Sequence, residues 1–238
     1  MLVELIAMTQ LYGVTVDRML SYFEGEADLP NGPAALVEFA GRTCYKSYHK
    51  PNPATAQNLE YIRNLIEKGH HSPLEHASAS FYVVGASRSL LTELERHRHI
   101  SFSVESQRFC RPEEYPAIPP LIRKNQHLTD VLVSRYHEML GWYDSLVDEL
   151  KRLFPDVRYK QIREAARAVL PNMTPVRMVV TGNFRAWRDV ISRRIDPEAD
   201  QEIREFSWMV LEALRNPGTA TVSRAFPEAF PDFPEELE

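Results

Sequence analysis

The sequence predicts a single α+β domain, in which a small β-sheet is packed by several helices. Most of the chain carries hydrophobic residues at helical spacing, whereas three short segments, at 2–7, 78–84 and 176–181, show the alternation or the β-branched and aromatic content of strands. Helices mixed with a few separated strands are the pattern of the α+β class. With 238 residues, 44% of them hydrophobic, the chain is long enough for one substantial core.

The helices follow from apolar periodicity and from signals at their ends. The clearest helix spans 52–69, where apolar residues recur three or four positions apart and Gly69 marks a C-terminal stop. A long amphipathic helix is predicted at 128–154, after a proline-rich loop at 111–125. Further helices are predicted at 34–45, 87–96, 158–169, 183–194 and 199–215.

The last segment, 216–238, differs in composition from the predicted domain at 1–215. It is rich in proline and phenylalanine, and it ends in acidic residues. Such a segment is expected to be extended and partly disordered, unless its phenylalanines dock on the domain.

Charge and cysteine content limit the function classes. A net charge of −5 argues against a general nucleic-acid binder, which normally has a basic surface. The two cysteines, Cys44 and Cys110, form no CxxC pair, which indicates a reducing compartment. The N-terminus lacks the features of a signal peptide, and no apolar run is long enough to span a bilayer. We therefore expect a cytoplasmic protein without nucleic-acid or membrane partners.

The most informative segment is 96–109, which contains three arginines, two histidines and three serines. Guanidinium groups bind phosphate in a fork, and hydroxyls together with backbone N–H groups complete such a site. The competing interpretation is a solvated basic helix end, where arginines interact favourably with the helix dipole. Ser101, Ser103 and Ser106 favour the anion site, because a salt-bridged surface does not need their hydroxyls.

A second candidate for anion binding is Arg167, which lies in an alanine- and valine-rich helix end. A buried guanidinium without a partner is costly, so an anion is expected beside it. Cys110, by contrast, is expected to be a small buried hydrophobe rather than a reactive thiol.

Metal chemistry and simple binding are the alternatives. His70, His76 and His97 could ligate a zinc ion with support from Glu75, which would make the protein a metal-dependent nucleotide phosphohydrolase. Against this, His97 lies between two arginines, whose charge opposes a cation. The other alternative is a nucleotide- or RNA-binding module without catalysis. A serine nucleophile is disfavoured, because no Gly-x-Ser-x-Gly elbow is present.

Three separated blocks match one family pattern in order. They are Gly69-His70-x-Ser72-Pro73-x-Glu75-His76, then Arg96-His97-Arg98-x-x-Ser101-x-Ser103-x-x-Ser106-x-Arg108-Phe109, and then Arg167-x-Val169-Leu170-Pro171 with Asn183-x-Arg185 and Arg194. With these blocks the sequence closely resembles the flavin-dependent thymidylate synthases over residues 42–204. The middle block is close to diagnostic of that family.

The resemblance implies the fold of that family and its reaction, the reductive methylation of dUMP to dTMP. In that family 5,10-methylenetetrahydrofolate supplies the carbon, and NADPH supplies reducing equivalents through FAD. The resemblance also implies a homotetramer with active sites at subunit interfaces.

Carried over residue by residue, the resemblance also implies which residues form the active site. It implies no metal ion in that site. Arg194 is the implied catalytic residue, which polarises the uracil and assists its ionisation at N3. A fixed guanidinium can stabilise such developing charge without proton transfer. The implied cofactor-binding residues are His70, Ser72, Glu75, Arg96, His97, Arg98, Val104, Asn183, Phe184, Arg185 and Asp189. The implied substrate-binding residues are Glu93, Leu94, Glu95, Arg96, Val104, Glu105, Ser106, Gln107, Arg108, Arg167 and Arg194.

Overall fold

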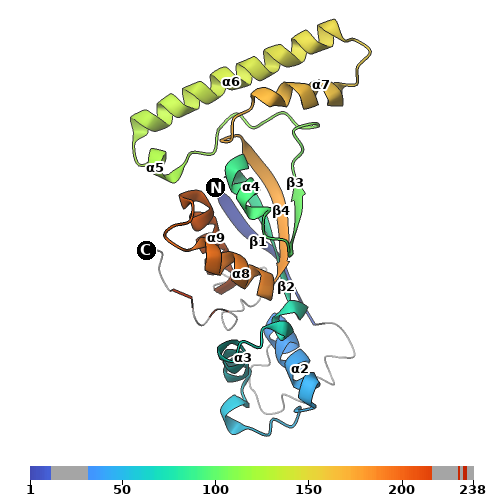
Figure 1. The fold of residues 1–238 in the computed structure, drawn as a ribbon, viewed down its shortest axis with the longest axis vertical. Helices are drawn as coiled ribbons and strands as arrows, with labels where there is room; N and C mark the ends of the chain where they lie inside the picture. The colour runs from blue at the N-terminus through green and yellow to red at the C-terminus, as the bar shows by residue number, and fades with distance from the viewer. Residues whose placement is uncertain (12–31, 216–229, 231–232, 235–238) are drawn as a thin grey trace.

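The computed structural model describes residues 1–11, 32–215, 230 and 233–234. It confirms the α+β class, because a four-stranded sheet carries helices on its surface and at both of its ends (Figure 1). The strands are β1 (Leu2–Met8), β2 (Ser78–Ser87), β3 (Ile100–Val104) and β4 (Pro175–Asn183). The α-helices are α2 (Pro33–Tyr45), α3 (Asn58–Glu67), α4 (Arg88–Leu94), α5 (Pro120–Arg123), α6 (Gln126–Leu153), α7 (Tyr159–Ala166), α8 (Phe184–Arg194) and α9 (Gln201–Arg215). The short 3-10 helices within the described ranges are η2 (Pro53–Thr55), η3 (Ser72–His76) and η4 (Arg167–Val169).

The sheet has the strand order β1-β2-β4-β3, and all neighbouring strands are antiparallel. Its register places Phe81 opposite Val180 and Val180 opposite Phe102. Residues on β2 and β4 alternate between buried and half-buried positions, which is the pattern of a sheet with one face on the core. The buried face therefore sets where the helices pack.

Strand β3 is not predicted from the sequence. Ser101 and Ser103 are exposed, whereas Phe102 and Val104 pack against the core. This alternation is the period of a strand. The alternation is short, and the arginines, histidines and serines around it in the sequence indicate a binding loop instead of a strand.

The predicted start of the helix at 52–69 is wrong. The Asn52 side chain accepts a hydrogen bond from the Ala54 N–H at 3.0 Å and so begins the 3-10 helix η2, and α3 starts only at Asn58. The C-terminal stop is correct, since Gly69 follows α3 with a φ of +69°, a conformation that glycine adopts without strain.

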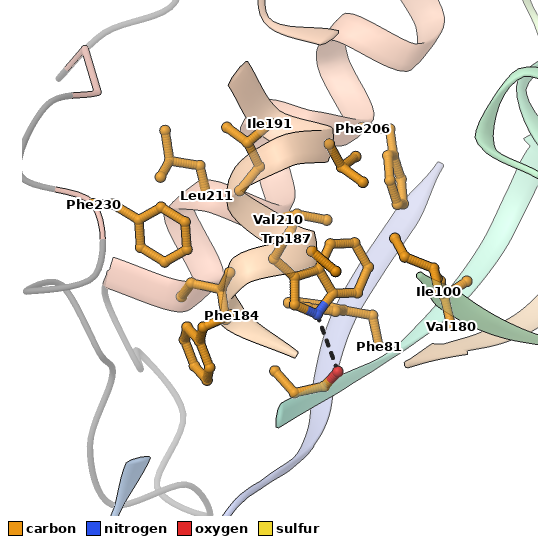
Figure 2. Packing of buried hydrophobic residues seen from close by; sticks show 14 of the residues in the cluster. Phe81, Ile100, Val180, Phe184, Trp187, Ile191, Phe206, Val210, Leu211 and Phe230 are labelled. Atoms are coloured by element: carbon orange, nitrogen blue, oxygen red, sulfur yellow. Dashed lines mark hydrogen bonds between the residues drawn. The ribbon is translucent and has the colours of Figure 1, made fainter. Parts of the chain in front are cut away.

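The main core lies between the sheet and helices α4, α8 and α9. Figure 2 shows Trp187 at its centre, with the indole Nε1 donating a hydrogen bond to the Ala79 carbonyl at 3.1 Å. Phe81 lies edge-on to this indole, with 5.0 Å between ring centroids. Phe206 and Val210 of α9 complete the packing around α8. Because α8 is fixed to the sheet in this way, the polar residues along it are held in place.

Helices α6 and α7 pair at one end of the sheet (Figure 1). They have a small apolar cluster of their own, formed by Tyr143, Val147, Ile162 and Ala166. Trp142 on α6 nevertheless has 71% of its surface exposed. No helix in the described part of the chain is long and apolar enough to cross a membrane.

Helices α2 and α3 pack against each other at the other end of the sheet (Figure 1). A buried network of polar side chains links them. Arg42 donates to Glu38 Oε1 at 2.6 Å and to the Thr55 carbonyl at 2.6 Å, and Asn58 donates to Glu38 Oε2 at 2.7 Å. Burial raises the pKa of Glu38, while these hydrogen bonds oppose the shift. The network fixes the C-terminal end of α2 next to the loop that carries His70.

Two phenylalanines of the predicted tail dock on the domain. Phe230 is buried against Phe184, with 6.2 Å between ring centroids, and Phe233 lies edge-on to Phe230. Arg215 donates to the carbonyls of Phe230 at 2.8 Å and Phe233 at 2.7 Å. Phe230 and Phe233 therefore dock on the domain, as the sequence analysis allowed for the phenylalanines of this segment. Residues 216–229, 231–232 and 235–238 lie outside the described residues. The domain boundary at 215/216 stays a prediction.

We expect Phe230→Ala to lower the free energy of unfolding by about 3 kcal/mol, because truncating a buried phenylalanine leaves a cavity in the core. Denaturant unfolding of the full chain measures the loss. Phe154→Ala is the matched control, since Phe154 is 51% exposed and its truncation should change stability by no more than about 0.5 kcal/mol. An equal loss in both variants would show that the tail does not stabilise the domain.

Candidate active site

The N-terminal end of α8 brings together two sequence blocks that are far apart in the chain. Asn183 caps the helix, because its side chain accepts a hydrogen bond from the Ala186 N–H at 2.8 Å. Arg185, on the first turn, forms an ion pair with Glu75 of η3. A pocket of about 370 Å³ lies beside this pair, and it is lined by Gly41, Cys44, Tyr45, Leu65, Gly69, His70, His71, Ser72, Pro73 and Arg185.

The C-terminal half of α8 forms a second pocket with the segment that follows α4. Its volume is about 600 Å³. Four arginines and one carboxylate contribute to the wall, so its charge favours an anion. The lining residues are Arg96, His97, Arg98, His99, Asp189, Arg193 and Arg194.

Arg194 is held at the wall of this second pocket by three hydrogen bonds. Its Nε donates to His97 Nε2 at 3.0 Å, its Nη1 donates to Glu93 Oε2 at 2.9 Å, and its Nη2 donates to the Glu93 carbonyl at 3.2 Å. The side chain is 18% exposed. The guanidinium is therefore a positive charge held in one place, because hydrogen bonds anchor it on both sides.

His97 connects Arg194 to Asp189. The Nδ1 atom of His97 lies 3.5 Å from Asp189 Oδ2, and the other oxygen of Asp189 accepts from Arg193 Nε at 2.8 Å. Burial lowers the pKa of His97 below its usual value, and the charge of Arg194 lowers it further, while Asp189 opposes the shift. His97 is consequently neutral at neutral pH.

A second group of cations surrounds the turn after β3. The Ser106 hydroxyl accepts from the Arg108 N–H at 3.3 Å, and Arg108 pairs with Glu164 at 2.7 Å. Arg88 donates to the Glu105 carbonyl at 3.1 Å, but its Nε is buried and has no hydrogen-bond partner in the described residues. Burial, followed by the charge of Arg167, lowers the pKa of Arg88. Clustered positive charge and an unpaired buried donor indicate an anion site.

The expected burial of Arg167 is wrong, and its place in an anion site stays a prediction. Arg167 is exposed in η4 and not buried in a helix end. The expected burial of Cys110 is wrong too, because Cys110 is an exposed free thiol. Ala166 is buried, but Ala165 and Ala168 on either side are exposed like Arg167, so the apolar composition of this segment does not reflect its burial.

The remaining predicted residues fall into two groups. Leu94 and Phe184 are buried in the core, so only their backbone atoms can face a ligand. Glu95 is exposed at the end of α4, Val104 and Glu105 are half-buried at the end of β3, and Gln107 is half-buried in the following turn. Ser101 and Ser103, expected to contribute hydroxyls to the anion site, lie on β3 instead.

The metal-dependent alternative gains no support from the fold. Within the described residues, no three histidine, cysteine, aspartate or glutamate side chains gather closely enough to hold a metal ion. His97 instead faces Arg194 and Asp189, in a pocket walled by arginines. His70, His76 and His97 are therefore not brought together as one cluster in the described part of the chain.

Three further residues beside the proposed site, Arg88, Cys44 and Tyr45, carry no signal in the sequence. Arg88 starts α4 directly after the N-cap Ser87, where it resembles an ordinary surface residue in the sequence. Its position beside Arg167 arises only from the folding of distant segments. Cys44 and Tyr45 reach the first pocket because α2 ends next to His70, and no local signal marks them.

Comparison with known proteins identifies the family of the chain. The family model described as thymidylate synthase complementing protein matches residues 27–217. A probable flavin-dependent thymidylate synthase of Mycobacterium phage L5 is 52% identical over 187 residues, which are 76% of this chain and 75% of the relative. The flavin-dependent thymidylate synthase of Mycolicibacterium vanbaalenii is 44% identical over 222 residues, covering 89% of this chain and 86% of the relative.

Solved structures show the same fold. The flavin-dependent thymidylate synthase of Helicobacter pylori, crystallised with FAD and dUMP, superimposes with a TM-score of 0.61 at 20% identity, covering 90% of this chain and 93% of that chain. A UMP/dUMP methylase of Streptomyces cacaoi superimposes with a TM-score of 0.66 at 22% identity, covering 90% and 89%. Together with the sequence relatives, these matches show that the chain belongs to the flavin-dependent thymidylate synthase family.

Proposed function

We propose that this protein catalyses the reductive methylation of dUMP to dTMP, with 5,10-methylenetetrahydrofolate as carbon donor and NADPH as reductant through FAD. The observation that carries the proposal is the anchored Arg194 at the wall of a cationic pocket. A preorganised guanidinium stabilises negative charge that develops on a bound ring, and it needs no reorganisation when the charge appears. This is the requirement for activating a uracil ring without a protein nucleophile.

The residues present fit a flavin dinucleotide. The two pockets lie toward opposite ends of α8, whose 11 residues span roughly 16 Å. An extended ligand with a ring system at each end and a diphosphate between them suits such a pair of pockets. Bound FAD would supply hydride chemistry, which side chains cannot provide. Its proposed holders are His70, Ser72, Glu75, Arg96, His97, Arg98, Val104, Asn183, Phe184, Arg185 and Asp189.

The proposed role of Arg194 is to bind the uracil ring of dUMP. Its hydrogen bonds to Glu93 and His97 engage three of the five N–H donors of the guanidinium. The other two are available to a uracil carbonyl and to N3. Donation to these atoms favours the ionised ring, which is the more reactive nucleophile at C5.

The dUMP phosphate is assigned to the cation cluster around the turn after β3. Ser106 and Arg108 supply donors from the turn itself, Arg88 supplies a buried unpaired Nε–H, and Arg167 adds exposed positive charge. A phosphate would satisfy the buried donor and reduce the repulsion between Arg88 and Arg167. Glu93, Leu94, Glu95, Arg96, Val104, Glu105 and Gln107 complete the proposed substrate set.

We expect Arg88→Ala to raise the KM for dUMP by about 10- to 100-fold, since a lost charge-assisted hydrogen bond is worth ~1.5–3 kcal/mol. Flavin content should not change. Steady-state kinetics measure the effect, with Arg135→Ala as the matched control, because Arg135 is exposed on α6 and pairs only with nearby Glu138 among the described residues. An unchanged KM in Arg88→Ala would remove Arg88 from the phosphate site.

The co-substrates and the assembly complete the proposal. His70 lines the first pocket, and Glu75 pairs with Arg185 at its wall, on the side where folate and NADPH would meet the flavin. We propose a cytoplasmic homotetramer whose active sites are shared between subunits. Exposed apolar side chains on the α6–α7 pair, such as Trp142 and Leu153, support the association of subunits. Buried apolar contacts of this kind are a common driving force for assembly.

The visible spectrum of the purified full chain tests the cofactor part of this proposal. We expect flavin absorbance, and we expect dUMP to perturb it, because the two ligands share Arg96 and the second pocket. A colourless protein that does not take up added FAD would contradict the proposal.

A further inference from the structure

The hydrogen bond between His97 and Arg194 determines the tautomer of His97. An arginine Nε can only donate, so His97 Nε2, which lies 3.0 Å away, must accept. A neutral imidazole with an accepting Nε2 carries its proton on Nδ1. The orientation of Arg194 therefore depends on where His97 holds a single proton.

A carboxylate lies on the side of His97 that carries this proton. Asp189 Oδ2 is 3.5 Å from Nδ1, and Asp189 is on α8, one helical turn before Arg193 and Arg194. The side chain of His97 is 8% exposed, so water competes little for Nδ1. A negative charge at this position stabilises the Nδ1–H tautomer and disfavours the alternative one.

We propose that Asp189 is a positioning residue that keeps His97 in the Nδ1–H tautomer, so that His97 Nε2 holds the guanidinium of Arg194 toward the pocket. This goes beyond the flavin contact expected of Asp189, and its consequence for turnover rests on the proposed function of Arg194. The order of contacts is Arg193, Asp189, His97, Arg194 and Glu93.

The charges around His97 are consistent with this role. Arg194 and Arg193 on α8 lower the pKa of His97, Asp189 raises it, and the net shift is downward because burial has the largest effect. Arg96, Arg98 and His99 line the same pocket from the segment after α4, and Glu93 binds the far side of Arg194. A protonated imidazolium would have no lone pair for Arg194, so a depressed pKa preserves the contact.

Two substitutions of Asp189 distinguish its proposed effect on the orientation of His97 from an effect of its negative charge alone. In Asp189→Asn the amide oxygen can still accept from Nδ1–H, whereas in Asp189→Ala nothing replaces the acceptor. If Asp189 acted only through its charge on a flavin, both variants would behave alike. If it sets the tautomer, the asparagine variant should retain most of the wild-type behaviour.

Nitrogen-15 NMR of histidine-labelled full-length protein reads the tautomer directly, independently of any activity. We expect the Nδ1–H form of His97 in the wild type and in Asp189→Asn, and a mixture with the Nε2–H form in Asp189→Ala. We also expect kcat to fall about 10- to 100-fold in Asp189→Ala, the size of effect that follows from a misplaced catalytic group. The asparagine variant should restore kcat to within a few-fold of wild type.

Asp148→Ala, which removes an exposed carboxylate on α6, is the control for a change of net charge. A pure Nδ1–H signal in Asp189→Ala would overturn the proposal, as would equal loss of kcat and of bound flavin in both Asp189 variants. The NMR signal of His97 tests the role of Asp189 without any turnover, whereas kcat also depends on the proposed role of Arg194. If Arg194 proved dispensable for turnover, the proposed function would fail while the NMR result would still hold.

Discussion

Arg194→Ala is expected to reduce turnover by about 10²–10³-fold or more, the range found when one preorganised donor to a developing anion is removed. The loss should appear in kcat, because the guanidinium is proposed to interact more strongly with the ionised uracil than with the neutral ring. Flavin content should be largely preserved, since Arg96, Arg98 and Arg185 remain in the two pockets. Steady-state kinetics together with the visible spectrum measure both quantities on one preparation.

Arg194→Lys provides the matched comparison. It keeps the charge but cannot bridge His97 and Glu93 as a planar fork, so its turnover should fall between those of the alanine variant and the wild type. If Arg194→Ala retained activity within about tenfold of wild type, a difference of only ~1.4 kcal/mol in the barrier, the proposed activation of uracil would be wrong.

Trp187→Ala is expected to have the largest effect on stability, a loss of about 3–5 kcal/mol in the free energy of unfolding. Trp187 is fully buried, lies edge-on to Phe81, and donates a hydrogen bond to the Ala79 carbonyl. Its truncation would leave a cavity between α8 and the sheet. Because a chain of this size loses ~2–4 °C in Tm per kcal/mol, thermal unfolding should shift by more than about 6 °C.

Two companion variants separate the contributions of Trp187. Trp187→Phe keeps an aromatic ring and removes only the indole N–H, so its cost should be clearly smaller than that of the alanine variant. Tyr115→Ala is the control for losing an aromatic side chain, since Tyr115 is 60% exposed and its truncation leaves the core unchanged. A similar shift for Trp187→Ala and Tyr115→Ala would contradict the central position assigned to Trp187.

Much of the fold could be predicted from local patterns. The predicted bounds of α6 and α8 agree with the observed ones to within a few residues, because apolar residues recur at helical spacing in both segments. Strand β3 could not be predicted, since its alternation of Phe102 and Val104 with serines is short and lies within a polar motif. Its strand character depends on pairing with β4, which is a non-local interaction.

The site was predictable where the motif itself carries the chemistry. Arg96, His97 and Arg98 do line one pocket with Arg194, although almost a hundred residues separate the two segments. Other residues beside the proposed site cannot be recognised from their residue type, because only folding brings them there. Arg88 is recognised from its buried Nε, which has no hydrogen-bond partner among the described residues, and from the nearby charge of Arg167, both of which are properties of the folded chain.

The most direct test of the proposed reaction is the release of tritium from dUMP labelled at C5. Methylation at C5 must replace that hydrogen, so the assay follows the reacting atom itself. With 5,10-methylenetetrahydrofolate, FAD and NADPH present, we predict that the wild type releases tritium and forms dTMP. In Arg194→Ala both tritium release and dTMP formation should be almost completely lost. Absence of tritium release from the wild-type protein with all components present and flavin bound would contradict the assignment of this chain as a thymidylate synthase.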